Sequence, residues 1–481
     1  MYRPTIGLEI HAELKTRTKM FCACLNDPDE RDPNKNICPV CMAHPGTLPV
    51  INKEAVHKVL LVGAALGAEL ADYTEFDRKN YFYPDIPKGY QISQYKFPLV
   101  TGGALQGVAL TRIHLEEDTA RSQHFADPDK GGKGDKSLVD FNRAGVPLME
   151  LVTEPVIHSA ESAGAFAREL QLLLRYLGAS EANMEKGEMR LEANISVAPA
   201  TLLGKLGITH GPLGTKVEVK NINSFRSVER AIAYEIERQT TLLEKGEEVV
   251  QETRGWDDVA LKTFSQRKKE KAQDYRYFPD PDLPKLQLSE VPEFSSARLV
   301  GELPELPWQK RERYVALDVG KEYVEMFISD PRFGDMFEQA SHLNPALTKP
   351  LASIVGSDIA GLVSKLGEEG LAHITPLGLS AAVARFAQGE ISSRGMKDAL
   401  AEVFAHGGDL AEVSKKYLQQ SDTGALRQVA QKIIEAHPSV VADYRAGKAA
   451  AVQFLVGQGM KETKGSANPE ALRQAFLNIL G

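Results

Sequence analysis

Polar residues alternate with apolar ones in a short segment near the start of the chain. From Ile6 to Leu14 every second residue is apolar, and Glu9, His11 and Glu13 lie between them. Successive side chains of a β-strand point to opposite faces of the sheet, so this pattern predicts a strand with one packed face. The other face of that strand would carry two carboxylates and an imidazole.

Acidic residues interrupt other apolar segments in the same way. Glu150 and Glu192 each lie between apolar neighbours, and Glu117 belongs to a run that mixes charged and apolar residues. Each segment taken alone fits the solvated face of an ordinary antiparallel strand. Together with Glu9 and His11, these acids predict one site for a divalent metal ion and phosphates, because hard cations such as Mg²⁺ prefer carboxylate oxygens.

Helical patterns separate these strands. Apolar residues recur at helical spacing in the segments 52–66 and 225–244, and Ser159 is a suitable N-cap for a helix that ends at Gly178. Helices and strands do not alternate strictly. We therefore expect an α+β fold with a mainly antiparallel sheet and flanking helices, rather than a doubly wound sheet.

Prolines mark the end of this mixed region. Six of them lie between residues 279 and 307, and helical patterns dominate the rest of the chain. We expect a large first domain at 1–292 with a four-cysteine insertion at 22–41, an α-helical domain at 293–407 and a small helical tail domain at 408–481.

Composition and charge narrow the classes of protein. The chain has 481 residues, of which 43% are hydrophobic and 25% charged, as in globular proteins. Without a signal-peptide pattern or an apolar run of ~20 residues, we expect a cytoplasmic protein and no membrane contact. The net charge is −8, but the segment 411–481 has nine Lys or Arg against six Asp or Glu, a balance of +3 that leaves −11 for the rest. Lys461 and Lys464 in this tail are candidate contacts for RNA phosphates, and a solvated loop is the alternative.

All four cysteines lie in one short window: Cys22, Cys24, Cys38 and Cys41. Two close pairs of thiolates are typical of structural Zn²⁺ sites. Four reduced thiols or a degenerate site are the alternatives. If all four are metal ligands, no cysteine remains as the nucleophile of a glutaminase, and no Ser-rich amidase signature is present. Any ammonia that the protein uses must then be made elsewhere.

Longer motifs resemble those of a known family. They are Gly7-Leu-Glu-Ile-His-Ala-Glu-Leu14, Phe76-Asp-Arg-Lys-Asn-Tyr-Phe-Tyr-Pro-Asp85, Lys88-Gly-Tyr-Gln-Ile-Ser-Gln-Tyr95, Ile113-His-Leu-Glu-Glu-Asp118, Asn142-Arg-Ala-Gly-Val-Pro-Leu148 and Asp274-Tyr-Arg-Tyr-Phe-Pro-Asp-Pro-Asp282. Over essentially its whole length the chain is similar to the B subunits of bacterial glutamyl/aspartyl-tRNA amidotransferases.

The resemblance implies a ligase of protein biosynthesis with glutamine as amido donor. A cradle-like catalytic domain would use ATP and Mg²⁺ to phosphorylate the side-chain carboxylate of Glu on tRNA(Gln) or Asp on tRNA(Asn). Ammonia from a partner amidase (A) subunit would then give Gln-tRNA(Gln) or Asn-tRNA(Asn). A small C subunit would complete the heterotrimer, the cysteines would hold structural Zn²⁺, and the tail would contact tRNA.

The resemblance also implies roles for single residues. The implied catalytic residues are Glu9, His11, Lys79, Glu117, Glu150 and Glu192. Glu9, His11, Glu117 and Glu150 would gather Mg²⁺, while Lys79 and Glu117 would serve the ATP phosphates. Glu192 departs from the family, in which we expect Arg-Cys-Asp-Ala-Asn around this position.

Two other functions stay open on the sequence. The chain could be a non-catalytic tRNA-binding scaffold of the same complex, with structural acids. It could also be a free-standing amide ligase acting on free glutamate, which would not need tRNA.

Overall fold

The computed structural model describes residues 2–126, 134–200, 213–268, 275–419, 423–463 and 467–481. The chain forms two compact units, Met1–Pro307 and Trp308–Gly481. Each unit is described by itself. The expected domain boundaries at residues 292 and 407 stay predictions.

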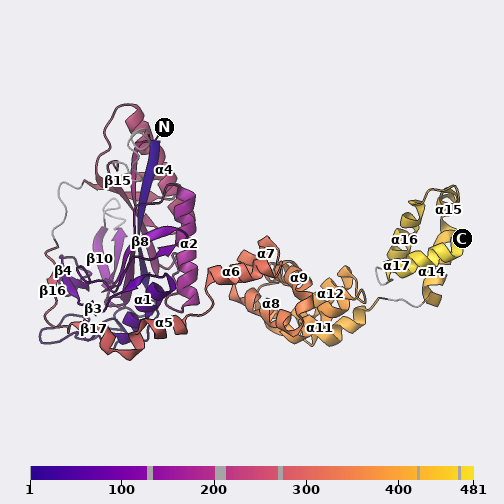
Figure 1. Ribbon diagram of the computed structural model, residues 1–481, viewed down its shortest axis with the longest axis horizontal. Coiled ribbons are helices and arrows are strands. Elements are labelled where there is room, and N and C mark those ends of the chain that lie inside the picture. Colours follow the sequence, from indigo (N-terminus) through magenta and orange to yellow (C-terminus); the bar gives the residue numbers. More distant parts are fainter. Residues whose placement is uncertain (1, 127–133, 201–212, 269–274, 420–422, 464–466) are drawn as a thin grey trace. The chain divides into compact units, whose positions relative to one another are not determined.

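A ten-stranded sheet is the centre of the first unit (Figure 1). Its strands follow the order β15-β14-β13-β12-β1-β11-β8-β6-β2, and β7 pairs with β8. The described pairs are antiparallel except β13 with β14, which confirms the expected α+β fold class. The bounds are β1 Tyr2–Glu13, β2 Glu69–Leu70, β6 Val100–Thr101, β7 Ala104–Leu105, β8 Val108–Glu117, β11 Pro147–Thr153, β12 Met189–Pro199, β13 Val217–Ile222, β14 Glu252–Asp257 and β15 Lys262–Lys268.

One face of the sheet is packed because alternate residues of its central strands are apolar. Ile6, Leu8 and Ile10 on β1 are at most 1% exposed, and so are Leu191 and Ile195 on β12. Helix α1 packs on β8, α4 packs on β12, and α2 packs on α4. In Figure 1, α2 and α4 run along one side of the strands. The predicted division of β1 into a packed and a polar face is confirmed.

The helices of the first unit begin at side-chain caps. Asn52, Ser159 and Ser224 each accept hydrogen bonds from backbone N–H groups of the first turn, which would otherwise lack partners. All three helices lie where the sequence predicted them. The bounds are α1 Lys53–Ala65, α2 Ala160–Tyr176, α4 Phe225–Glu244 and α5 Ser296–Glu302.

Three smaller sheets complete the first unit. Their strands are β3 Tyr73–Thr74 with β17 Leu286–Gln287, β4 Asp77–Asn80 with β5 Tyr90–Ser93 and β16 Phe278–Pro279, and β9 Arg121–Ala126 with β10 Gly134–Asp140. The pairing of β16 with β4 brings two distant family-like motifs together. Residues 275–279 thereby lie beside Lys79 on β4.

The second unit is helical. Its α-helices are α6 Pro307–Ala316, α7 Lys321–Ser329, α8 Pro331–Leu343, α9 Thr348–Ser353, α10 Ala360–Leu366, α11 Pro376–Ala387, α12 Ser393–His406, α13 Leu410–Val413, α14 Thr423–Ala436, α15 Pro438–Arg445, α16 Ala451–Glu462 and α17 Pro469–Leu480. Leu426, Leu455 and Phe476 are core residues of the last four helices. The helical stretch Pro345–Leu366 has the length and hydropathy of a membrane span, but 44% of its most apolar window is buried, and core helices of other proteins pass the same test.

Two glycines of the second unit give a test of its packing. A Cβ on Gly334 of α8 would lie 2.2 Å from the Phe327 carbonyl oxygen, whereas a Cβ on Gly361 of α10 would meet nothing within 4 Å. We expect Gly334→Ala to lower the free energy of unfolding by ~1–3 kcal/mol, because backbone must move. Gly361→Ala should be neutral or stabilise by up to ~1 kcal/mol. Calorimetric unfolding of the full chain measures the stability of both variants. Equal unfolding temperatures for Gly334→Ala and Gly361→Ala would contradict the packing around Gly334.

Candidate functional site

Four polar side chains line up across the central strands of the sheet. His11 on β1 is opposite Arg190 on β12 and opposite Glu150 on β11, and Glu150 is opposite His114 on β8. Directly opposed residues of antiparallel strands project to the same face and are close neighbours. The register of three strand pairs therefore builds one polar row.

Glu150 is the centre of a buried group of acids and imidazoles. Its Oε2 lies 3.3 Å from His11 Nε2 and 3.3 Å from His114 Nε2. Glu116 lies 3.7 Å from His11 Nε2 through Oε1 and 3.9 Å from His114 Nε2 through Oε2. Two overlapping sets have all their possible ligand atoms within 4.8 Å of one another: Glu9, His11 and Glu150, and His114, Glu116 and Glu150.

His114 and Glu116 are not among the site residues predicted from the sequence. Both lie on β8, where they alternate with Ile113 and Leu115, which are fully buried. The same alternation that identified Glu9 and His11 on β1 would have found them. We call Glu9, His11, His114, Glu116 and Glu150 the acid–histidine group.

Glu117 does not join the acid–histidine group, because consecutive residues of a strand face opposite ways. Its Oε1 lies 2.7 Å from Lys88 Nζ and accepts a hydrogen bond from the Ile92 N–H at 3.0 Å. Glu117 lines a second cavity of about 320 Å³, together with Lys88 and Cys41. The prediction that Glu117 lies beside Glu9 and His11 is wrong, and Glu116 lies there instead.

Glu192 lies in the same row of the sheet as Glu9 but has a different partner. Glu9 and Glu192 face each other across β1 and β12. Glu192 Oε2 lies 2.6 Å from Lys220 Nζ on β13, and Lys220 Nζ also lies 3.7 Å from Glu218 Oε1. The longer acid at this position thus forms an ion pair with Lys220 and stands outside the acid–histidine group.

The acid–histidine group opens into a cavity of about 450 Å³, which Glu192 also lines. Four cations line this cavity: Lys79, Arg112, Arg190 and Lys220. Four tyrosines also line it: Tyr81, Tyr95, Tyr275 and Tyr277.

Tyr95 stacks on Tyr277 with ring centroids 4.4 Å apart, and 60% of Tyr95 is exposed. Lys79 Nζ lies 5.3 Å from the centre of the Tyr275 ring. Acids, cations and aromatic rings therefore share one cavity.

The charges in the acid–histidine group balance one another. Burial alone lowers the pKa of His11, but the hydrogen bond and negative charge of Glu150, with the charges of Glu116 and Glu9, raise that pKa to about 9. Burial raises the pKa of Glu150, but His114 and His11 hold it well below its usual range. In the metal-free protein, His11 is therefore an imidazolium beside an ionised Glu150 at neutral pH.

Two further groups show the surplus of negative charge. Burial and the neighbouring carboxylates Glu150 and Glu192 raise the pKa of Glu9. Burial lowers the pKa of Lys79, but the charges of Glu116 and Glu150, with those of the neighbouring tyrosines, together outweigh it and raise that pKa. Lys79 therefore stays charged at every pH at which the protein would work.

The donor set fits a hard divalent cation. The carboxylates of Glu9 and Glu150 are close together and poorly solvated. Burial and the charge of Glu150 raise the pKa of Glu9, and a bound cation would offset both effects. His11 would have to lose its proton before it became a ligand. The surrounding Lys and Arg side chains are the groups that bind phosphate oxygens in proteins.

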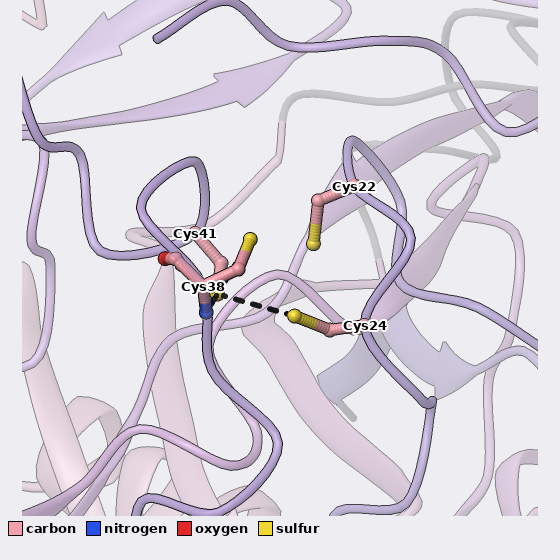
Figure 2. Close-up of side chains that lie close together, drawn as sticks. All are labelled: Cys22, Cys24, Cys38 and Cys41. Carbon is pink, nitrogen blue, oxygen red and sulfur yellow. Dashed lines mark hydrogen bonds between the residues drawn. The ribbon is translucent and has the colours of Figure 1, made fainter.

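The four cysteines converge from two loop segments (Figure 2). Cys41 Sγ lies 3.9 Å from Cys38 Sγ and 4.0 Å from Cys24 Sγ, and all four sulfurs lie within 4.8 Å of one another. Zn–S bonds of about 2.3 Å in a tetrahedron place sulfurs roughly 3.8 Å apart. These distances fit one tetrahedral metal ion, as the sequence predicted.

Of the two tail lysines that the sequence suggested as RNA contacts, only Lys461 lies within the described residues. Lys461 is exposed in the last turn of α16. Lys464 lies outside the described residues. The N-terminus of the next helix, α17, is capped by Asn468, whose side chain accepts from the N–H groups of Glu470 and Ala471. The role of both lysines in RNA binding stays a prediction.

Family models match most of the chain. A model described as the GatB/GatE catalytic domain matches residues 4–292, and one described as the GatB domain matches residues 335–480.

Curated relatives match the chain along its full length. Proteins named as the B subunit of aspartyl/glutamyl-tRNA(Asn/Gln) amidotransferase are 43% identical in Thermus thermophilus, 42% in Crocosphaera subtropica and 41% in Persephonella marina. Each alignment covers 100% of this chain and at least 98% of the relative.

The shifted pKa of His11 gives a test of the acid–histidine group in the metal-free protein. We expect Glu150→Gln to bring the pKa of His11 from about 9 down to its usual value near ~6.5 or lower, because the main opposing carboxylate is lost. Since the pKa of His11 is raised by folding, its contribution to stability is present below pH ~6.5 and lost as the pH rises through about 9. In Glu150→Gln, the stability of the protein should no longer fall between pH ~6.5 and about 9 because of His11.

Mass-spectrometric exchange of the histidine C2 hydrogen reports the pKa of His11 directly. Glu181→Gln is the control, because this carboxylate is 60% exposed and pairs with Lys15 at the surface. An unchanged pKa of His11 in Glu150→Gln would refute the arrangement.

Proposed function

Because the chain belongs to the GatB family, whose named relatives are B subunits of aspartyl/glutamyl-tRNA(Asn/Gln) amidotransferases, we propose that it activates the side-chain carboxylate of a misacylated tRNA. The chain is a component of a ligase-type amidotransferase. Its substrates would be Glu-tRNA(Gln), Asp-tRNA(Asn) or both, with ATP as the phosphate donor.

The reaction needs ATP because a carboxylate is a poor electrophile. Attack by ammonia would have to expel oxide. Transfer of the γ-phosphoryl group of ATP to a carboxylate oxygen gives ADP and an acyl phosphate. Ammonia then attacks the acyl carbon, the C–O bond to phosphate breaks, and the nitrogen loses one proton to the departing phosphate, so the products are the amide and hydrogen phosphate.

The observation that carries this proposal is the acid–histidine group inside a cavity lined by cations and tyrosines. Glu9 and Glu150 would hold Mg²⁺, with Glu116 and a deprotonated His11 nearby. A bound Mg²⁺ would neutralise phosphate charge and align the γ-phosphoryl group. Lys79 is the permanent cation of the cavity, and it would bind phosphate oxygens as a compact point charge.

The arginines and tyrosines of the cavity extend this assignment. Arg112 Nη2 lies 3.7 Å from Glu150 Oε1, so it links the acids to the open cavity, where it would contact phosphate. Tyr95 presents a ring that is 60% exposed and supported from behind by Tyr277. A nucleobase could extend this stack, as bases do on aromatic side chains.

Glu117 and Glu192 would act indirectly. Glu117 holds Lys88 and the Ile92 N–H in the second cavity. Glu192 holds Lys220 at one side of the first cavity. Both would position cations near the substrates rather than bind Mg²⁺.

The arrangement of the cysteines supports an external source of ammonia. All four cysteines of the sequence lie in one cluster that fits a metal, so none is placed as a glutaminase nucleophile. We propose an amidase (A) subunit as the ammonia source and a small C subunit as the third partner. Lys461 and Lys464 would contact the tRNA backbone.

Substitution of Glu150 separates a catalytic role from that of a scaffold that only binds tRNA. With the partner amidase, ATP, Mg²⁺ and misacylated tRNA but no glutamine, Glu150→Gln should lower the rate of ADP formation by ~100-fold or more, because the metal loses a charged ligand. Its tRNA affinity should stay within about twofold, since a buried carboxylate adds little to phosphate contacts. Glu181→Gln should match the unchanged protein in both measurements.

Glu117→Gln separates the two cavities in the same assay. Its loss of ADP formation should be much smaller than that of Glu150→Gln, because Glu117 faces the second cavity. A parallel loss of tRNA binding and ADP formation in Glu150→Gln would favour the scaffold. ADP formation with free glutamate and no tRNA would favour a free-standing ligase.

Substitution of Tyr95 tests the role of the stacked tyrosines. Tyr95→Ala should raise the KM for ATP by roughly 5- to 100-fold, because base stacking on an aromatic side chain contributes ~1–3 kcal/mol. Tyr95→Phe should keep the KM. Tyr83→Ala is the matched control, since Tyr83 is also 60% exposed but is not among the residues that line the cavity. If Tyr95→Ala instead weakens only tRNA binding, the stack holds a tRNA nucleotide and not ATP.

A further inference from the structure

Lys19 is a buried lysine in the loop that carries the first two cysteines. It is 1% exposed, and its Nζ donates a hydrogen bond to the Phe141 carbonyl oxygen at 3.2 Å. Within the described part of the chain, no carboxylate forms an ion pair with it. An ammonium group removed from water costs several kcal/mol unless an anion lies nearby. A nearby anion would therefore stabilise the ammonium group of Lys19.

The cysteine cluster is the neighbouring group that can become an anion. The side chains of Cys41 and Lys19 both flank Gly145. A Cβ added to this glycine would lie 3.7 Å from Cys41 Cβ and 3.7 Å from Lys19 Cδ. The Lys19 N–H also donates to the Cys24 carbonyl oxygen at 3.0 Å. The backbone of Lys19 is thus bonded to the cysteine loop, and its side chain adjoins the same glycine as the side chain of Cys41.

Glu117 is a carboxylate that also adjoins Gly145, with Oε2 3.9 Å from the position of the added Cβ, but other groups already balance its charge. Lys88 Nζ lies 2.7 Å from Glu117 Oε1 and 2.8 Å from Oε2, and the Ile92 N–H donates to Oε1. This leaves the thiolates as the counter-charge available to Lys19.

We propose that Lys19 is the buried counter-ion of a metal centre formed by Cys22, Cys24, Cys38 and Cys41. Four thiolates around one Zn²⁺ carry a net charge of −2, and the ammonium of Lys19 offsets half of it. The same charge lowers the cost of burying the lysine. The two groups therefore stabilise each other only when the metal is bound.

Four neutral thiols would leave the buried ammonium of Lys19 without an anion. Thiolates bound to a metal would supply that anion, so the burial of Lys19 favours a metal centre over four reduced thiols.

Lys19 also joins the metal centre to the second cavity. The Met20 N–H donates to the Gly145 carbonyl oxygen at 2.7 Å, and Lys19 Nζ donates to Phe141, so the loop is held against residues 141–145. Gly145 and Cys41 line the cavity that contains Glu117. Loss of the metal would remove the charge that keeps Lys19 in this position.

Zinc affinity tests the proposal without any assay of activity. In competition with a chromophoric chelator, Lys19→Met should bind Zn²⁺ ~10- to 100-fold more weakly than the unchanged protein, as changes beside metal ligands commonly do. Lys19→Arg keeps the charge and should lose less. Lys15→Met is the control, because Lys15 is 64% exposed and pairs with Glu181, and it should bind normally.

Thermal unfolding with and without zinc distinguishes a counter-ion from a packing residue. In the zinc-loaded state, Lys19→Met should have a lower Tm than the unchanged protein. In the chelated state its Tm should be equal or higher, because an unpaired buried charge has been replaced by an apolar side chain of similar length. Lower stability in both states, unchanged zinc affinity in Lys19→Met, or no zinc binding by the unchanged protein would each overturn the proposal.

Discussion

The register of β1 between β11 and β12 is the constraint on which the site depends. It places His11 opposite Glu150 and Arg190, and Glu9 opposite Glu192. A shift of one residue would turn the apolar side chains of β1 toward the cavity and the charged ones toward the helices. Because the other face must pack against α1, α2 and α4, burial of Ile6, Leu8 and Ile10 fixes the positions of the charged groups as well.

Charge balance explains why so many ionisable groups can lie together in this unit. Glu150 ionises because His114 and His11 adjoin it, and His11 keeps its proton because Glu150, Glu116 and Glu9 surround it. The balance is incomplete at Glu9, whose pKa is raised. A buried surplus of carboxylate next to fixed cations suits a ligand that is itself mixed in charge, such as a metal–nucleotide complex.

The alternation of a strand also separates two functions on β8. Glu116 contributes to the acid–histidine group, and Glu117 turns to Lys88 in the cavity beside the cysteines. The proposed catalytic cavity and the proposed metal centre are thus connected through adjacent residues of one strand.

The sequence by itself determined the elements and the residue types of the site. It predicted the two faces of β1, the helices capped by Asn52 and Ser159, and a cysteine cluster whose sulfurs do converge. These are local properties, since strand alternation and caps act over a few residues. Tertiary structure alone decided which acids meet: Glu116 instead of Glu117 beside His11, and Lys220 as the partner of Glu192. Pairing partners and register lie far apart in the sequence, so periodicity gives the face of a side chain but not its neighbours.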